Sequence, residues 1–234
     1  MLRNPRRNFV CLLAVLASLL IGAVAVGDLA TTARYGSYLA IDSLLANDKP
    51  VSAQVIADYA QRLSKSPQTC RTDILNSAVD IAMRNVEQET ASFDRTAWIA
   101  SLRSLEPLLR DSLACMPTNG LLWARLAVVR WLLGGTAEEQ ASLLTMSQAY
   151  APSELRVIRS RMVQWRRVSP KVLELAERAL RSDVRTILNY AEVSAAKRLL
   201  ADVPPLVKPF VAEEALVLPE ERRTAFVQAG IPLD

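Results

Sequence analysis

The sequence predicts an all-α protein in which an apolar N-terminal helix precedes a series of amphipathic helices. Two observations support this fold class. Residues 9–26 form a run of 18 residues without a charge. The rest of the chain repeats apolar residues at helical spacing, between short breaks that contain Pro, Gly, Asn or Asp. No segment alternates apolar and polar residues as a half-buried strand would.

The uncharged run at residues 9–26 is long enough to cross a membrane. At 1.5 Å per residue it spans about 27 Å, close to the thickness of a hydrocarbon core. Arg3, Arg6 and Arg7 precede it. The first acidic residue, Asp28, follows it, so we expect the N-terminus in the cytoplasm and the bulk of the chain across the membrane.

Two interpretations of this segment, residues 1–27, stay open. It is either an uncleaved transmembrane anchor or a signal peptide cleaved after the small-x-small run at residues 23–25. Arg greatly outnumbers Lys, as is typical of GC-rich bacteria. We therefore expect a single-pass protein of a bacterial inner membrane with its bulk in the periplasm, or a soluble periplasmic protein if the signal is cleaved.

Composition argues against several classes of function. The chain has no His, which excludes Ser-His-Asp and Cys-His catalysis and His-based zinc sites within it. Although the pI is about 9.1, the excess of basic residues comes mostly from the three N-terminal arginines, so nucleic-acid binding is not expected. We predict no catalytic residue, no metal site and no cofactor.

Four helices are expected in the first half of the domain that follows. The first covers residues 30–46 and ends at a break over residues 47–50. Ser52 caps the second, which ends near residues 65–67. The third runs from about Cys70 to Val86, and the fourth starts at Ser92 or Asp94. Pro107 is expected to kink or break the fourth helix, because proline lacks an N–H and clashes with the preceding turn.

The second half continues this pattern. A helix over about 120–133 ends at Gly134-Gly135, and Thr136 with Glu139 matches a capping box for a helix that ends near Tyr150. Pro152 and Ser153 start the next helix, and Ser169-Pro170 starts one that continues to about Leu188. We divide the chain into a helical domain over 28–200 and an acidic C-terminal tail over 201–234, extended apart from a short helix near 219–228.

Residues 118–152 resemble a tetratricopeptide repeat. Units of that family are helix–turn–helix hairpins with Trp, Leu and a small residue on the first helix and a closing Pro. The matching positions here are Trp123, Leu126, Ala127, Ala141 and Pro152. The chain departs from the family at Arg130, where the family prefers Tyr, and the spacing to the closing Pro is about one residue long.

The resemblance implies a stack of helical hairpins, with a second and weaker unit over residues 70–117. A single hairpin cannot bury its apolar face alone and needs stacked neighbours. An irregular helical bundle would show the same periodicity, so that alternative stays open. We expect Trp123, Trp131 and Trp165 to be core residues and not ligand platforms. In overall plan the chain also resembles single-span helical-repeat proteins of the bacterial envelope, some of which accompany exopolysaccharide or O-antigen systems.

Residues 156–185 carry nine basic and three acidic residues. The candidate binding face within this stretch consists of Arg156, Arg159, Arg161, Arg166 and Arg167. Such a face would bind an anionic partner: an acidic glycan, lipid headgroups or an acidic protein surface. The alternative is a solvated helix face, or one neutralised by the tail, where six acidic residues oppose three basic ones.

A disulfide between Cys70 and Cys115 is predicted, since these are the only cysteines beyond the apolar run and an oxidising periplasm permits pairing. Cys70 lies near the start of one expected helix and Cys115 near the end of the next. In an antiparallel hairpin those two ends are neighbours. Two independent buried thiols are the alternative.

Two functions from different classes follow. The first is a membrane-anchored periplasmic scaffold for protein–protein interaction, serving envelope polysaccharide assembly or export and without enzymatic activity. Its partners would be a protein of the cell envelope, the inner membrane through residues 9–26 and, as a further candidate, an acidic glycan. The second is a carboxylate-dependent, glycan-active periplasmic enzyme, against which the lack of His and of a Gly-rich catalytic loop counts.

The orientation can be measured with C-terminal fusions. Because Arg3, Arg6 and Arg7 precede the uncharged run, a phosphatase fused to the C-terminus is expected to be active and a fluorescent protein fused there to be dark. An inactive phosphatase together with a fluorescent fusion would contradict the periplasmic placement.

Overall fold

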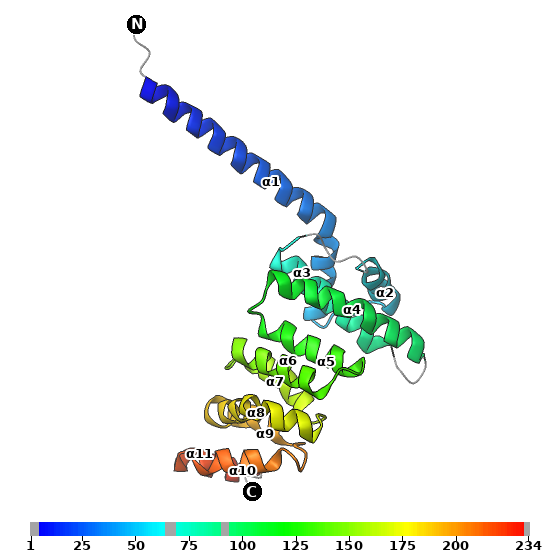
Figure 1. Cartoon of the computed structure of the whole chain (residues 1–234), viewed down its shortest axis with the longest axis vertical. Helices are drawn as coiled ribbons and strands as arrows, with labels where there is room; N and C mark the ends of the chain where they lie inside the picture. The colour runs from blue at the N-terminus through cyan, green and yellow to red at the C-terminus, as the bar shows by residue number, and fades with distance from the viewer. Residues whose placement is uncertain (1–4, 64–68, 90–93, 232–234) are drawn as a thin grey trace.

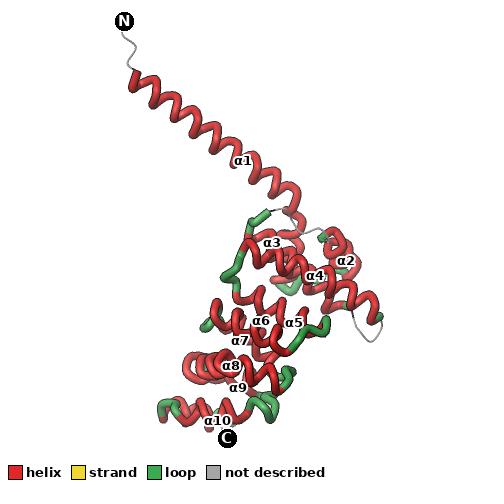
Figure 2. The backbone as a smooth tube through the Cα atoms, viewed as in Figure 1, coloured by secondary structure: helices red, strands yellow, loops and turns green. Residues whose placement is uncertain are grey.

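The computed structural model describes residues 5–63, 69–89 and 94–231, and this part of the chain contains eleven helices and no strand. Figures 1 and 2 show an elongated arrangement, with the apolar half of the first helix at one end and the C-terminus at the other. The all-α fold class predicted from the sequence is confirmed. One continuous hydrophobic core links the helices, from Tyr38 in the first to Ile231 near the end of the chain.

Helix α1 is a single unbroken helix, Pro5–Ala46. The apolar run and the next expected helix are therefore continuous, and Gly27 does not interrupt them. The apolar half projects away from the other helices (Figure 1), and its large apolar side chains are exposed, from 50% for Leu13 to 70% for Leu29. This half is long and apolar enough to span a membrane or to act as a signal sequence.

Ten further helices follow α1. Their bounds are α2 Ala53–Arg62, α3 Thr72–Gln88, α4 Arg95–Cys115, α5 Gly120–Leu132, α6 Ala137–Tyr150, α7 Leu155–Trp165, α8 Pro170–Tyr190, α9 Val193–Leu200, α10 Lys208–Leu216 and α11 Glu220–Gln228. Side chains cap several of them at the N-terminus, as the sequence predicts: Ser52 for α2, Asp94 for α4, Thr136 for α6 and Ser169 for α8. The other expected start of α4, Ser92, lies outside the described residues.

The helices pack in chain order along the long axis (Figure 1). α1 and α2 both contact α3, then α3 contacts α4, α4 contacts α5 and α5 contacts α6. Beyond that point α6 packs on α8, and α8 packs on α10. A second row of contacts joins α5 to α7. The second half of α1 enters this arrangement through Tyr38 and Ile41, which are buried against the domain.

Glycines shape the α5–α6 hairpin at the start of α5 and at the turn between the two helices. A Cβ on Gly120 would lie 2.5 Å from Cβ of Ala151 and 2.8 Å from the carbonyl oxygen of Ser147, so only glycine allows this close approach. Gly134 has a φ of +84° after the last turn of α5. The amide of Gly135 then donates to the carbonyl of Arg130 at 2.7 Å, which closes the helix end as in a Schellman motif.

Two expectations about local structure need correction. Pro107 does not break its helix: it lies inside α4, which continues to Cys115. Both Pro107 and Arg103, whose carbonyl loses its helical partner, are exposed, so water can satisfy that carbonyl while the opposite face stays packed. The second error concerns residues 208–216, expected to be extended. They form α10, because Val211 and Ala215 are buried and the helix packs against α8.

The three tryptophans expected in the core differ in how deeply they are buried. Trp165 is fully buried and is a core anchor as expected. Trp123 is half-buried against the core, stacks on Tyr150 with ring centroids 6.5 Å apart, and donates its Nε1–H to the carbonyl of Pro117 at 2.8 Å. Trp131 is only half-buried.

The Cys70–Cys115 disulfide predicted from the sequence is present. It joins Cys70, two residues before α3, to the last residue of α4, and the two Cα atoms are 5.4 Å apart. This distance lies within the usual range for bridged cysteines. The bridge closes the base of the α3–α4 hairpin across 45 residues of sequence.

Loss of this bridge is expected to destabilise the folded protein. In the chain-entropy model a loop of this length gives about 4 kcal/mol, so the Cys70→Ser/Cys115→Ser variant should unfold at a clearly lower temperature than the oxidised wild type. Mass spectrometry of the unreduced protein should find the 70–115 cross-link. Two freely alkylated thiols in the folded, oxidised protein would contradict the pairing.

Candidate functional site

The five arginines of the predicted binding face do not share one surface. Arg156, Arg159 and Arg167 are exposed and Arg166 is half-buried. Arg161 has no exposed area at all. Its membership of a binding face is therefore corrected: it is a structural residue. The physical reason is the buried carboxylate that faces it from α8.

Arg161 is the centre of a buried polar network. Its Nε and Nη2 donate to the two carboxylate oxygens of Asp183 at 2.8 and 2.6 Å. Its Nη1 donates to the carbonyl and hydroxyl oxygens of Ser147, at 3.1 and 3.0 Å, and Nη2 also donates to the carbonyl of Ala151 at 3.0 Å. Trp165 Nε1 donates to Asp183 at 2.9 Å. Every N–H direction of the guanidinium is thus used within the protein.

This network ties together α5, α6, α7 and α8. The Ser147 hydroxyl that accepts from Arg161 donates in turn to the carbonyl of Gly120, at 2.7 Å. Burial raises the pKa of Asp183, and the hydrogen bonds from Arg161 and Trp165 oppose that rise. Sequence reasoning missed the pair. Arg161 and Asp183 lie 22 residues apart on different helices, and no local pattern marks them as partners.

Two of the three arginines of α8, Arg181 and Arg185, are neutralised by the tail, as one sequence alternative held for the basic stretch. Arg181 pairs with Glu213 of α10 at 2.7 Å, and Arg185 pairs with Glu214 at 2.8 Å. The hydrogen bonds that Arg181 donates to Glu177 and Glu213 raise the pKa of Arg181. Glu214 is buried at this contact. Residues of the predicted acidic tail thus cover part of the surface of α8. Among the described residues, Arg156 and Arg159 of α7, Arg167 after it and Arg178 of α8 keep no ion pair.

The exposed arginines of α7 border a cleft with a volume of about 520 Å³. Four helices contribute to it: the end of α1 with the turn after it, α3, α5 and α7. Its lining residues are Asp42, Leu45, Ala46, Asp48, Asp80, Met83, Arg84, Glu87, Leu121, Arg125, Val128, Arg156, Arg159, Ser160 and Val163. The volume lies in the range of ordinary ligand pockets.

The cleft has walls of opposite charge. The acidic wall comes from α1, the turn after it and α3, and includes Asp42, Asp48 and Asp80 beside the Arg84–Glu87 pair. The basic wall comes from α7, where Arg156 and Arg159 have no ion pair with the described part of the chain. Three of the four carboxylates that line the cleft already have partners. Asp80 pairs with Arg125, Glu87 pairs with Arg84 at 3.1 Å, and Asp42 accepts a hydrogen bond from Ser77 at 2.8 Å.

Arg166 and Arg167 lie outside this cleft and differ from each other. Nη2 of Arg166 donates to the carbonyl of Leu199 at 3.1 Å, near the end of α9. This arginine therefore holds α9 against α7. Arg167 has no ion pair with the described residues and does not line the cleft. Of the five predicted residues, the structure brings only Arg156 and Arg159 to the cleft.

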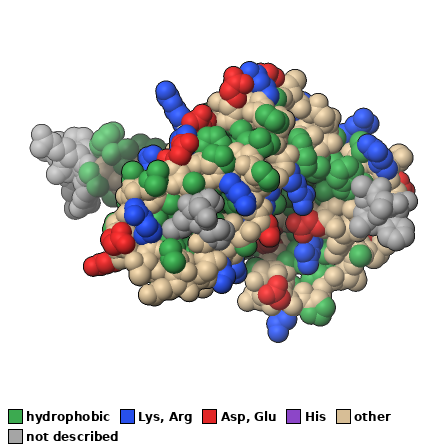
Figure 3. Space-filling view, turned by 90° about the horizontal axis from the view of Figure 1, so that it is seen from below, with side chains coloured by type: hydrophobic (Ala, Val, Ile, Leu, Met, Phe, Trp, Pro, Cys, Tyr) green, Lys and Arg blue, Asp and Glu red, His purple; other side chains and the backbone are tan. Residues whose placement is uncertain are grey.

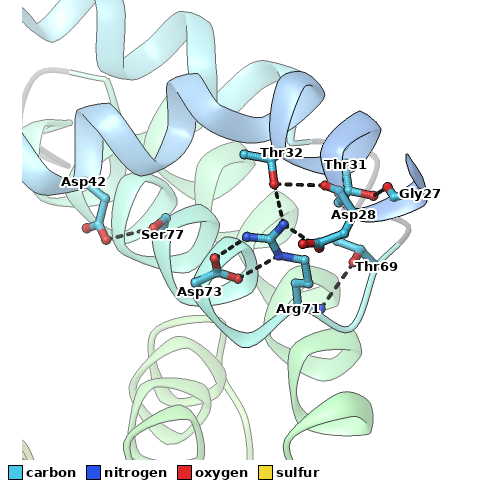
Figure 4. A network of polar contacts seen from close by, with 9 residues as sticks. All are labelled: Gly27, Asp28, Thr31, Thr32, Asp42, Thr69, Arg71, Asp73 and Ser77. Atoms are coloured by element: carbon cyan, nitrogen blue, oxygen red, sulfur yellow. Dashed lines mark hydrogen bonds and ion pairs between the residues drawn. The ribbon is translucent and has the colours of Figure 1, made fainter. Parts of the chain in front are cut away.

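A second polar network fixes the exit of the apolar helix from the domain (Figure 4). Nη1 of Arg71 donates to Asp28 at 2.8 Å and to the hydroxyl of Thr32 at 2.6 Å, while Nη2 donates to Asp73 at 2.6 Å. The hydrogen bond from Arg71 lowers the pKa of Asp73. Since Cys70 is the next residue in the chain, the disulfide and this network hold α1, α3 and α4 together at one point.

Known proteins give no further guide to this site. No family model, no curated protein and no solved structure compared with the chain matches it. Within the described residues no group of three or more Cys, Asp or Glu side chains is placed to hold a metal ion. The cleft is therefore interpreted from its own geometry and charge.

Substitution of either residue of the Arg161–Asp183 pair is expected to lower the stability of the folded protein. Asp183→Asn leaves a buried guanidinium without its counter-charge, which costs about 3–5 kcal/mol. Arg161→Met should cost a similar amount, and the double variant less than the sum of the two single effects, because the residues contact each other directly. Thermal melts followed by circular dichroism would measure this.

The matched control is Arg167→Gln, which removes an exposed arginine two turns further along the chain and should change stability by no more than about 0.5 kcal/mol. Equal melting temperatures for Asp183→Asn and wild type would refute the structural role of the pair.

Proposed function

We propose that the protein is a membrane-anchored interaction scaffold of the bacterial envelope. The observation that carries the proposal is the cleft between α1, α3, α5 and α7, whose basic wall keeps Arg156 and Arg159 without ion pairs in the described chain. Unpaired charges of one sign beside a hollow favour binding of an oppositely charged surface. In this proposal the consecutive helical hairpins form a tetratricopeptide-like stack, and the cleft lies along its inner face.

The anchoring part of the proposal rests on α1. An unbroken helix of 42 residues carries an exposed apolar half at one end and a buried contact with α3 at the other. The disulfide supports an oxidising compartment, which for a bacterial chain is the periplasm. A scaffold built in this way would hold its partner at a fixed place near the inner membrane. We retain envelope polysaccharide assembly or export as the process that it serves.

The chemistry of the cleft supports binding more than catalysis. Asp80 is held by Arg125, and Asp42 accepts from Ser77. A glycan-cleaving site needs two carboxylates that face a substrate as acid and as base or nucleophile. Here three of the four cleft carboxylates, Glu87 with Arg84 included, serve contacts within the protein, which makes such a pair less available.

The test is capture from detergent extracts followed by reconstitution with the captured protein. Arg156→Gln/Arg159→Gln should weaken binding by about tenfold or more and flatten its salt dependence, since both charges lie on the basic wall. The melting temperature should stay unchanged because both residues are exposed.

The control variant is Arg167→Gln/Arg178→Gln. It removes two exposed arginines that line neither wall and should leave binding unchanged. Equal loss in both double variants would show an unspecific effect of net charge. Glycan turnover by the purified protein would reject the scaffold and support the carboxylate-dependent enzyme.

A further inference from the structure

A second hollow continues the cleft toward the C-terminal end of the molecule. Its volume is about 470 Å³, and it lies between α7 and α9. It shares Arg159 and Val163 with the cleft, so the two hollows border each other. Its other lining residues are Met162, Arg166, Ala195, Arg198 and Leu199.

The charged residues that line this hollow are all positive. Three of its seven lining residues are arginines and none is acidic. Arg159 has no ion pair with the described residues. Nη1 of Arg198 donates to the hydroxyl of Ser194 at 3.2 Å, and that hydroxyl also contacts Glu192. The hydrogen bonds from Ser194, helped by the charge of Arg198, lower the pKa of Glu192. Asp202 lies 3.8 Å from Arg166 but is 82% exposed, and no described carboxylate forms an ion pair with Arg159 or Arg198. Such a weakly neutralised cluster favours an anionic occupant.

The surface between these arginines is apolar. Val163 is 48% exposed although its neighbours Met162 and Leu199 are buried, so an aliphatic surface is open to an occupant. The lining contains no aromatic residue on which a sugar ring could stack. The hollow also lies far along the stack from the apolar half of α1 (Figure 1), which argues against lipid headgroups. An acidic protein segment with an aliphatic side chain fits both the charge and the apolar floor.

We infer that the hollow between α7 and α9 binds an acidic, aliphatic segment of a partner protein, with carboxylates on Arg159 and Arg198 and an aliphatic side chain over Val163. This inference rests on the proposed scaffold function and names the chemistry of its partner. It places the end of the partner segment beyond the four-helix cleft. Arg166 contributes positive charge while it holds α9 in place through Leu199.

The experiment selects a random phage-displayed peptide library on the full-length protein in detergent. Enriched peptides should combine Asp or Glu with Leu, Ile, Val or Met. Their affinity, measured by fluorescence anisotropy, should fall by about tenfold or more in Arg198→Glu, because the variant places a like charge against the carboxylates. Val163→Asp should lower it further, since Val163 is exposed and can be changed without opening the core.

The matched control is Arg178→Glu, a charge reversal on an exposed arginine of α8 that has no ion pair with the described chain and does not line the hollow. It should leave peptide affinity unchanged. Enrichment of basic or neutral peptides, no enrichment, or equal affinity in Arg198→Glu and wild type would overturn the inference. If Arg156→Gln/Arg159→Gln weakens capture of the partner while Arg198→Glu does not, the scaffold stands and this site fails.

The competing occupant of the hollow is a second copy of the chain. Its own C-terminal end combines exposed aliphatic side chains, Leu216 and Val217, with the acidic start of α11, so it has the same chemistry as the proposed segment. The end of the molecule formed by the last helices shows hydrophobic side chains among charged ones (Figure 3). Sedimentation would then show self-association that Arg198→Glu abolishes and Arg178→Glu retains. That result, with no binding of the selected peptides, would overturn the proposed partner segment.

Discussion

The packing of the central helices depends on one buried guanidinium. Arg161 on α7 donates hydrogen bonds to Asp183 on α8, to Ser147 on α6 and to the carbonyl of Ala151 after α6. The Ser147 hydroxyl then donates to the carbonyl of Gly120 on α5. A buried charge is tolerated only when it is paired and its donors are satisfied. The four helices must therefore meet in this register, and that register sets the position of the α7 arginines along the cleft.

Packing of the C-terminal helices sorts the basic charges into two groups. α10 lies on α8 and supplies Glu213 and Glu214 to Arg181 and Arg185. α7 has no such cover, so Arg156 and Arg159 face the cleft. The acidic tail thus neutralises Arg181 and Arg185, while Arg156 and Arg159 keep no ion pair with the described residues. Surface pairs of this kind contribute little stability individually, but they decide which charges stay available.

A short series of contacts connects the apolar half of α1 to the cleft. Arg71 holds Asp28 and Thr32 of α1, the adjacent disulfide holds α4, and the end of the same α1 forms one wall of the cleft. A helix of 42 residues without a break transmits position better than a flexible linker would. The position of the cleft relative to the apolar half of α1 is therefore defined by these contacts.

The sequence by itself determined the elements that depend on local chemistry. Helical periodicity, the caps at Ser52, Thr136 and Ser169, the glycine stop after α5 and the Cys70–Cys115 bridge were all predictable, since each rests on neighbouring residues or on the two ends of one hairpin. Only the tertiary structure decided that Arg161 is buried while Arg159, two residues earlier, faces the cleft. It also decided that residues 208–216 are helical. The reason is that burial of a charge and helix formation in a weakly patterned segment depend on partners distant in sequence, whose positions no local pattern encodes.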